Sequence, residues 1–193
     1  MKRALHFNPN IYQVGITVGL LSLSAFFAAL ILAYSFRIES QGSWREFKVP
    51  TFLWLSTAFL AVSSWLLEAA RFSLRRGLVE IYRARLMGSV LLGLTFLGLQ
   101  ITAGYNLANQ GVGAEANPHG SAFYIFMGIH AAHLTAGIAW LQLLFHRSRK
   151  LSADNENTLR KHRVIASVAA TYWHFMGVVW AVMFYCLLRW TRS

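Results

Sequence analysis

The chain has 193 residues, of which 56% are hydrophobic and only 13% are charged, whereas an average soluble domain has about 25% charged residues. This composition excludes an ordinary soluble protein, and the single cysteine excludes an intrachain disulfide or a cysteine-based metal cluster. The formal net charge of +11 would suggest nucleic-acid binding in a soluble protein. Here the basic residues stand in short loops between apolar stretches, so we interpret the charge as membrane topology and expect no nucleic-acid partner.

Five apolar stretches are long enough to cross a bilayer, which takes about 20 mostly apolar residues. In chain order we predict helices at about 11–36, 51–70, 85–105, 121–145 and 164–188. The first stretch is too long for the apolar region of a cleaved signal peptide. Pro50 stands just before the second stretch, where a proline costs a helix least. The sequence therefore predicts an all-α fold, a polytopic membrane helix bundle that forms one domain over residues 1–193.

The basic residues also predict the orientation of the bundle. Thirteen of them fall on the side of the N-terminus: Lys2, Arg3, Arg71, Arg75, Arg76, Arg83, Arg85, Arg147, Arg149, Lys150, Arg160, Lys161 and Arg163. Five fall on the other side: Arg37, Arg45, Lys48, Arg189 and Arg192. Because basic loops stay in the cytoplasm, we expect the N-terminus inside and the C-terminus outside, with Leu107–Gly120 as an outer loop.

Three histidines lie inside the predicted membrane helices, where ionisable side chains are rare and need a reason. His130 and His133 stand three residues apart on the fourth helix and share a face, and His174 lies at a similar depth on the fifth. Imidazoles at one depth could ligate zinc, copper or iron. However, no carboxylate lies at that depth to orient the ligands. We therefore predict no metal site and expect neutral histidines that bond to a backbone carbonyl, a Tyr or Trp, or another helix.

Glu68 is the acidic residue set well within an apolar run, near the cytoplasmic end of the second helix. Arg71 and Arg75 follow at spacings that place them on roughly the same face, which predicts an interfacial ion pair. The alternative is a proton-uptake group or a lipid-headgroup contact. The sequence contains no glycine-rich phosphate loop and no recognisable Ser-His-Asp arrangement, so we predict no catalytic residue.

Two blocks of the sequence resemble a known family. The first, FYIFMGIHAAHLTAGIAW, spans Phe123–Trp140, and the second, TYWHFMGVVW, spans Thr171–Trp180. They are similar to blocks of subunit III of the haem-copper oxidases, whose patterns are matched here by Gly128, His130, His133 and Gly137, and by Tyr172, Trp173, His174 and Phe175. The family's SS-x-x-x-E-x-A pattern is matched by Ser63, Ser64, Glu68 and Ala70. The resemblance covers essentially the whole chain and is closest to the short, five-helix bacterial type.

The chain departs from the family pattern at three positions. Leu23 follows Ser22 where the family usually has an acidic residue, Gly177 stands where it often has Asp, and Ser56 stands where it often has Asn. The lost carboxylates weaken any proton-related role that the resemblance implies. They leave Glu68 as the one acidic group of interest and leave the structural role untouched.

The resemblance implies an accessory subunit of an oxygen-reducing, proton-translocating cytochrome c oxidase in the bacterial plasma membrane, with no active site of its own. Haems and copper are then expected in partner subunits and no redox cofactor in this chain. The resemblance implies direct contact with subunit I, assembly with subunit II and a small subunit IV, bound phospholipid, and support of proton uptake and oxygen access. The candidate subunit-packing or lipid-cleft residues are Glu68, His130, His133, Tyr172, Trp173 and His174.

Other functions stay open at this point. Within the same superfamily, the chain could be subunit III of a quinol oxidase or the homologue that accompanies nitric oxide reductase. A stand-alone transporter is a further alternative, although the sequence shows no inverted repeat and no helix pair interrupted by Gly or Pro. The three histidines leave a small membrane haem or metal protein as the last alternative.

Overall fold

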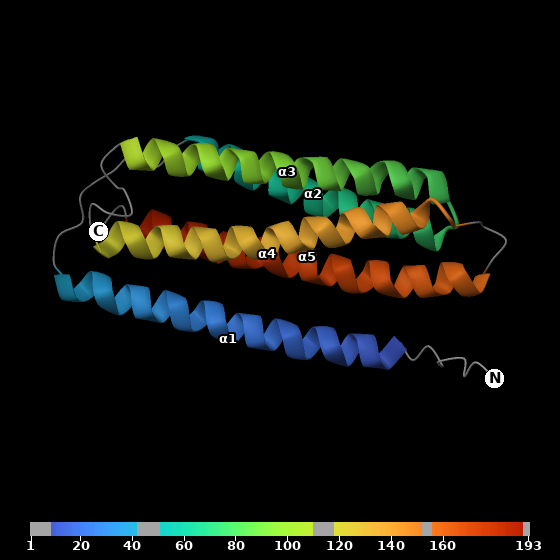
Figure 1. The fold of residues 1–193 in the computed structure, drawn as a ribbon, viewed down its shortest axis with the longest axis horizontal. Helices are drawn as coiled ribbons and strands as arrows, with labels where there is room; N and C mark the ends of the chain where they lie inside the picture. Colours follow the sequence, from blue (N-terminus) through green and yellow to red (C-terminus); the bar gives the residue numbers. More distant parts are fainter. Residues whose placement is uncertain (1–8, 42–50, 110–117, 152–155, 191–193) are drawn as a thin grey trace.

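The computed structural model describes residues 9–41, 51–109, 118–151 and 156–190, and these contain five α-helices and no strand. In chain order they are α1 (Pro9–Gln41), α2 (Thr51–Arg75), α3 (Val79–Asn109), α4 (Pro118–Ser148) and α5 (Glu156–Trp190) (Figure 1). By length and composition all five could cross a membrane. The predicted all-α, five-helix membrane bundle is confirmed. The predicted orientation stays a prediction, and Lys2, Arg3, Arg45, Lys48, Pro50, Arg192 and most of the outer loop lie outside the described residues.

The helices extend beyond the predicted bounds, mainly at the basic end of the bundle. The second ends at Arg75 rather than about 70, the third begins at Val79 rather than about 85, and the fifth begins at Glu156 rather than about 164. The apolar pattern predicts only the part of each helix that would lie in the hydrocarbon core of a membrane. With 35 residues, α5 is about 52 Å long, whereas the hydrocarbon core is about 30 Å thick.

A tight turn joins α2 to α3 and sets them side by side. Gly77 has φ of +78°, a left-handed conformation that glycine adopts without steric cost. Its backbone N–H donates to Leu74 O at 3.2 Å, and Leu78 N–H donates to Ser73 O at 3.0 Å. This pair of bonds is the Schellman motif that ends many helices, and it turns the chain directly into α3.

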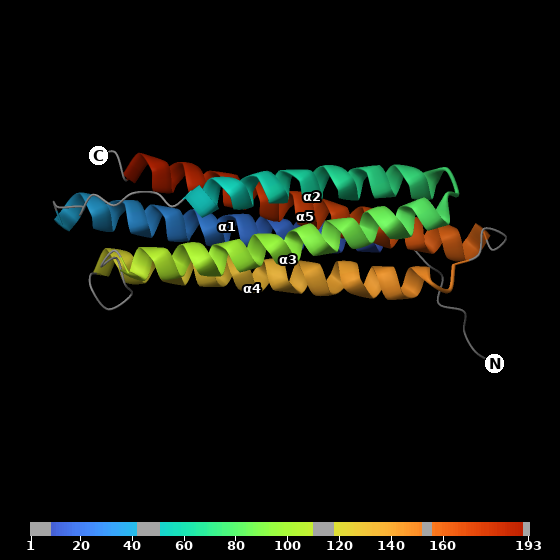
Figure 2. The ribbon, with the colours of Figure 1, turned by 90° about the horizontal axis from the view of Figure 1, so that it is seen from above.

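Four helices form a ring and the fifth lies outside it. Helix α2 contacts α3 and α5, and α4 contacts the same two, while α1 contacts only α4 and α5 within the described part of the chain. Figure 1 shows α1 below the other helices, and Figure 2 shows α2 and α5 on one side of the ring with α3 and α4 on the other. Among the described side chains of α1, only Phe27 is buried.

The ring is filled by side chains that reach across it. Trp173 of α5 is fully buried and its indole meets Gly93 of α3, where an added Cβ would lie 2.7 Å from Trp173 Cη2. Ser63 of α2 and Ser89 of α3 exchange hydroxyl-to-carbonyl bonds of 2.9 and 3.0 Å. Small residues at such crossings let helices approach where no hydrophobic effect drives them together.

The close contact between Trp173 and Gly93 leaves no room for a larger side chain at position 93. Gly93→Ala places a methyl group inside the indole's space, and we expect this overpacking to cost about 1–3 kcal/mol. A lowered thermal unfolding temperature of the detergent-solubilised chain would report it. Gly98→Ala, on the same helix with nothing within 4 Å of the added Cβ, is the matched control and should be neutral or slightly stabilising. Equal unfolding temperatures for the two variants would contradict the contact.

Candidate functional site

The three membrane histidines face different surroundings. His130 points among aromatic rings, His133 contacts backbone and Phe27, and His174 lies beside Glu68. No group of three or more His, Cys, Asp or Glu side chains that could hold a metal occurs among the described residues. His130, His133 and His174 therefore do not form a three-histidine cluster in this part of the chain.

His130 departs from the expectation that each histidine finds a polar partner. Its side chain is only 2% exposed, and neither ring nitrogen has a hydrogen-bond partner. The rings of Phe27, Phe96 and Trp180 surround it, with centroids 6.3, 6.4 and 5.7 Å away. The Trp180 N–H cannot serve His130, because it donates to Thr57 Oγ1 at 2.9 Å. His130 thus acts as a packing residue.

His133, Tyr172 and Trp173 join α4 to α5. A ring nitrogen of His133 lies 2.8 Å from Ile129 O, one turn earlier on α4, and His133 O accepts a 2.9 Å bond from Tyr172 Oη. Gly137 makes room for this contact, since a Cβ there would lie 3.0 Å from the Tyr172 ring. Trp173 is buried and its N–H has no partner. These three candidates are brought together as a helix–helix packing unit.

Glu68 forms the predicted ion pair with Arg71 and adds a contact that spacing alone could not reveal. Arg71 Nη1 donates to both carboxylate oxygens at 2.8 and 2.6 Å, and Arg71 Nη2 donates to Ser167 Oγ of α5 at 3.1 Å. His174 Nε2 lies 3.4 Å from Glu68 Oε2, so the expectation that no carboxylate stands at the depth of the histidines is wrong for His174. The side chains of Glu68 and His174 are 52% and 39% exposed. Arg75, the other expected partner, instead lines a pocket beside this pair.

That basic pocket lies between α1, α2 and α5 at the arginine-rich end of the bundle. It has a volume of about 450 Å³, and its lining includes Arg71, Arg75 and Arg163 together with Gln13 and Ser167. The pocket exists because α1 contacts α5 but not α2, so a wedge stays open between α1 and α2. Arg71 and Arg163 are each paired with a carboxylate, of Glu68 and Glu156, and Arg75 adds a further guanidinium group of the kind that binds phosphate and other anions.

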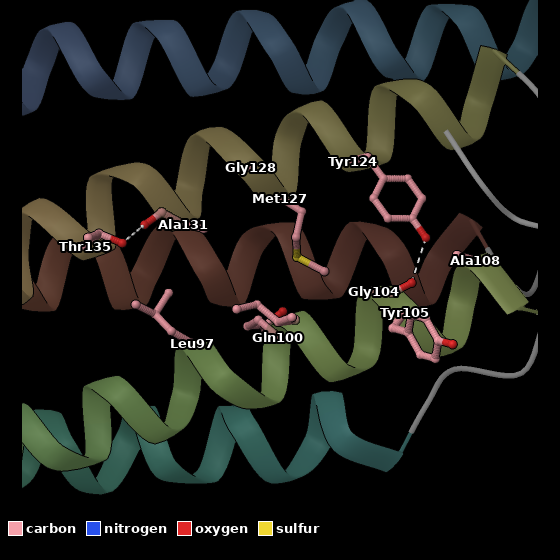
Figure 3. A pocket seen from close by; sticks show the side chains of 11 residues that line it. Leu97, Gln100, Gly104, Tyr105, Ala108, Tyr124, Met127, Gly128, Ala131 and Thr135 are labelled. Carbon is pink, nitrogen blue, oxygen red and sulfur yellow. Dashed lines mark hydrogen bonds between the residues drawn. The ribbon is translucent and has the colours of Figure 1, made fainter. Parts of the chain in front are cut away.

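Two further hollows lie on opposite faces of the ring. The α2–α5 groove, of about 320 Å³, includes Thr57, Ala61, Ser64, His174, Gly177, Trp180 and Ala181. The α3–α4 groove, of about 490 Å³, is almost entirely apolar. In Figure 3 Tyr124 and Met127 project from α4 toward α3, and Tyr124 Oη donates to Gly104 O at 2.8 Å. Gln100 lines the same groove and donates its amide N–H to Ser56 Oγ at 2.9 Å.

Several arginines that stand just beyond the apolar runs bond to backbone carbonyls of neighbouring helices. Arg85 Nη1 donates to Ala69 O at 2.9 Å, Arg163 Nε to Leu74 O at 3.2 Å, and Arg83 Nη2 to Ser148 O at 2.6 Å. Leu74 and Ser148 belong to the last turns of α2 and α4, where carbonyls lack a partner within the helix and cationic side chains are favourable, whereas Ala69 lies farther inside α2. The position of arginines just beyond an apolar run was the sequence signal for these bonds. It could not identify the carbonyls that accept them, because these lie on other helices.

Comparison with known proteins gives one consistent result. Residues 10–192 match the family described as cytochrome c oxidase subunit III. The cytochrome c oxidase subunit 3 of Thermostichus vulcanus is 29% identical over 193 residues, covering 97% of this chain and 91% of that protein. That of Corynebacterium diphtheriae is 33% identical over 184 residues, covering 91% and 86%. A probable quinol oxidase subunit 3 of Staphylococcus saprophyticus is 30% identical over 140 residues, covering 72% and 66%. The resemblance seen in the sequence blocks is confirmed.

The ring of His130 is buried, and neither of its nitrogens has a hydrogen-bond partner. Replacing a buried polar group that has no partner with an apolar side chain of similar size removes a desolvation penalty of about 1–3 kcal/mol. We therefore expect His130→Leu to raise the thermal unfolding temperature of the chain in detergent. His133→Leu, one turn away, loses the bond to Ile129 O and should leave the temperature unchanged or lower it. A marked drop for His130→Leu would show that His130 has a polar partner.

Proposed function

Because this chain belongs to the cytochrome c oxidase subunit III family, we propose that it packs beside the redox subunit of a bacterial haem-copper oxidase and stabilises it. In this proposal the chain carries no haem or copper and does no redox chemistry. It lies in the bacterial plasma membrane with subunit I as its direct partner, and subunit II and a small subunit IV complete the complex. The observation that carries the proposal is the family match, which spans residues 10–192.

We propose cytochrome c rather than quinol as the electron donor of the complex. Support comes from relatives named cytochrome c oxidase subunit 3, which match along nearly the whole chain, whereas the quinol oxidase relative matches over 72% of it. The packing of His133 and Tyr172 between α4 and α5 supports an accessory role, because these candidate residues join helices.

The proposal includes a bound phospholipid in the basic pocket. Arg71, Arg75 and Arg163 line a pocket toward the arginine-rich end of the bundle, and arginine side chains bind headgroup phosphates. Each arginine near a membrane surface is worth about 1 kcal/mol toward an anionic lipid. Acyl chains in the wedge would also provide an apolar path by which oxygen approaches the redox subunit.

Support of proton uptake is the remaining part of the proposal, and Glu68 is its candidate group. The carboxylate is held by Arg71 and His174 but stays half exposed, so it is available to a neighbouring subunit. It lies toward the arginine-rich end of the bundle, the end predicted to face the cytoplasm. A carboxylate in that position can raise the local proton concentration at the entry of a partner's proton path.

Purification of the tagged chain from its native membrane in a mild detergent tests the function. We expect a haem-bearing subunit in equal amount, a reduced-minus-oxidised haem spectrum, and oxygen consumption driven by reduced cytochrome c. Oxygen consumption with a quinol alone would favour the quinol oxidase alternative. A colourless chain without partners would overturn the proposal.

In the same preparation, Glu68→Gln should slow turnover most at alkaline pH, where proton supply is limiting. An unchanged pH profile would show that Glu68 takes no part in proton uptake.

The basic pocket generates a separate prediction on lipid. Arg75→Gln removes one of the three guanidinium groups, and we expect anionic phospholipid to be retained about fivefold less well, which corresponds to about 1 kcal/mol. Phosphorus analysis or native mass spectrometry of the purified protein measures the retained lipid. Arg76→Gln is the matched control, because the adjacent Arg76 lies over the Phe72 ring and not in the pocket. Equal lipid retention in both variants would argue against the pocket.

A further inference from the structure

The pair of Glu68 and His174 lies inside the span but open to the surroundings. Glu68 stands seven residues before Arg75 and His174 eleven after Arg163, or about 10 and 16 Å along their helices. With the membrane boundary placed at Arg75 and Arg163, a hydrocarbon core about 30 Å thick takes in both side chains, and Arg71 reaches Glu68 from the next helical turn. Their exposed fractions of 52% and 39% mean that the isolated chain presents a carboxylate and an imidazole to lipid tails.

Lipid tails are a poor cover for this pair. Arg71 binds both oxygens of the Glu68 carboxylate from one side, and the half of the side chain that stays exposed can accept further hydrogen bonds. Hydrocarbon offers no donor, and intramembrane ionisable groups almost always face protein or a water-filled cavity. The surface that covers Glu68 therefore has to bring a donor of its own.

The α2–α5 groove starts at His174, which contacts Glu68. Small side chains line the groove on both helices: Ala61 and Ser64 on α2, and Gly177 and Ala181 on α5. Trp180 forms part of the groove and is fixed by its bond to Thr57. Gly177 is central, because a Cβ there would meet only Ser64 Oγ at 3.8 Å. Small residues on adjoining helices permit the close approach of another helix in a membrane.

The face that carries the groove has no cover within the described chain. Helix α1 contacts α4 and α5 but not α2, and Figure 2 shows the face of α2 and α5 turned away from α3 and α4. A second copy of this chain is a poor occupant. A two-fold axis along the membrane normal would bring identical residues together at one depth, setting one Glu68 carboxylate against another.

We propose that the α2–α5 groove is the docking surface for a transmembrane helix of the oxidase's redox subunit, and that this helix donates a hydrogen bond to Glu68. The proposal rests on the accessory-subunit function and specifies which face of the bundle carries it. The docking helix presents an apolar stripe to Ala61 and Gly177, and at the depth of Glu68 it carries a side chain with an O–H or N–H donor.

Glycines that open onto different faces allow a sharp test in the full complex. Gly177→Leu fills the α2–α5 groove, whereas Gly128→Leu fills the α3–α4 groove and Gly98→Leu adds bulk to another exposed surface of α3. An added Cβ meets nothing within 4 Å at Gly98 or Gly128 and makes only an ordinary contact at Gly177. Each tagged variant is expressed with the other oxidase subunits, and the haem recovered per chain is measured.

We expect Gly177→Leu to lower the recovered haem at least tenfold, while Gly98→Leu and Gly128→Leu match the wild type. Ala61→Leu on the opposite wall and Glu68→Leu should lower it as well, with unfolding temperatures of the isolated variants close to wild type. Full recovery with Gly177→Leu and Ala61→Leu, or loss only with Gly128→Leu, would overturn the docking surface while leaving the accessory function standing. A wild-type chain that recovers no haem would instead overturn the accessory function itself, and the docking surface with it.

Discussion

The indole of Trp173 holds the ring of four helices together by crossing its middle. It starts on α5 and ends against Gly93 of α3, two helices whose backbones do not contact each other directly. In lipid, burial of apolar surface gives helices little reason to associate, and packing of this kind takes its place. Fixing α3 relative to α5 in turn fixes where Tyr172 meets His133 and where His174 meets Glu68, because these neighbours of Trp173 share its helix rotation.

The polar groups of the bundle divide into two kinds. Those inside the ring are mostly satisfied within the chain, as with the exchange between Ser63 and Ser89 or the bond from Gln100 to Ser56. The exceptions are His130, the indole N–H of Trp173 and the amide oxygen of Gln100, which are buried without a hydrogen-bond partner. At the surface, the side chain of Glu68 stays 52% exposed beside Arg71 and His174. This contrast is what a subunit needs if its interior is to stand alone and its surface is to be completed by neighbours.

The sequence predicted the helices because membrane-spanning helices are recognisable by their length and apolar composition. It predicted the pair of Glu68 and Arg71 because three residues on one helix is a fixed geometry. It could not predict that His174 would join this pair, since the rotation of α5 against α2 depends on packing around Trp173. It also placed the helix ends too far inward. Side chains such as Arg83, Arg85 and Arg163 satisfy carbonyls on neighbouring helices, and hydropathy carries no information about such partners.

The peripheral place of α1 has a consequence for biogenesis. This helix precedes the others in the chain, so a ribosome delivers it to the membrane before them, yet its contacts are with α4 and α5, the last two to emerge. Throughout the synthesis of α2 and α3 it has no helix of its own chain to dock on. Apolar side chains such as Val14, Leu21 and Phe26 are exposed on its surface. Such a helix is stable in lipid as a single span before the other helices are inserted. Among the described residues, the first helix of its own chain that α1 can contact is therefore α4.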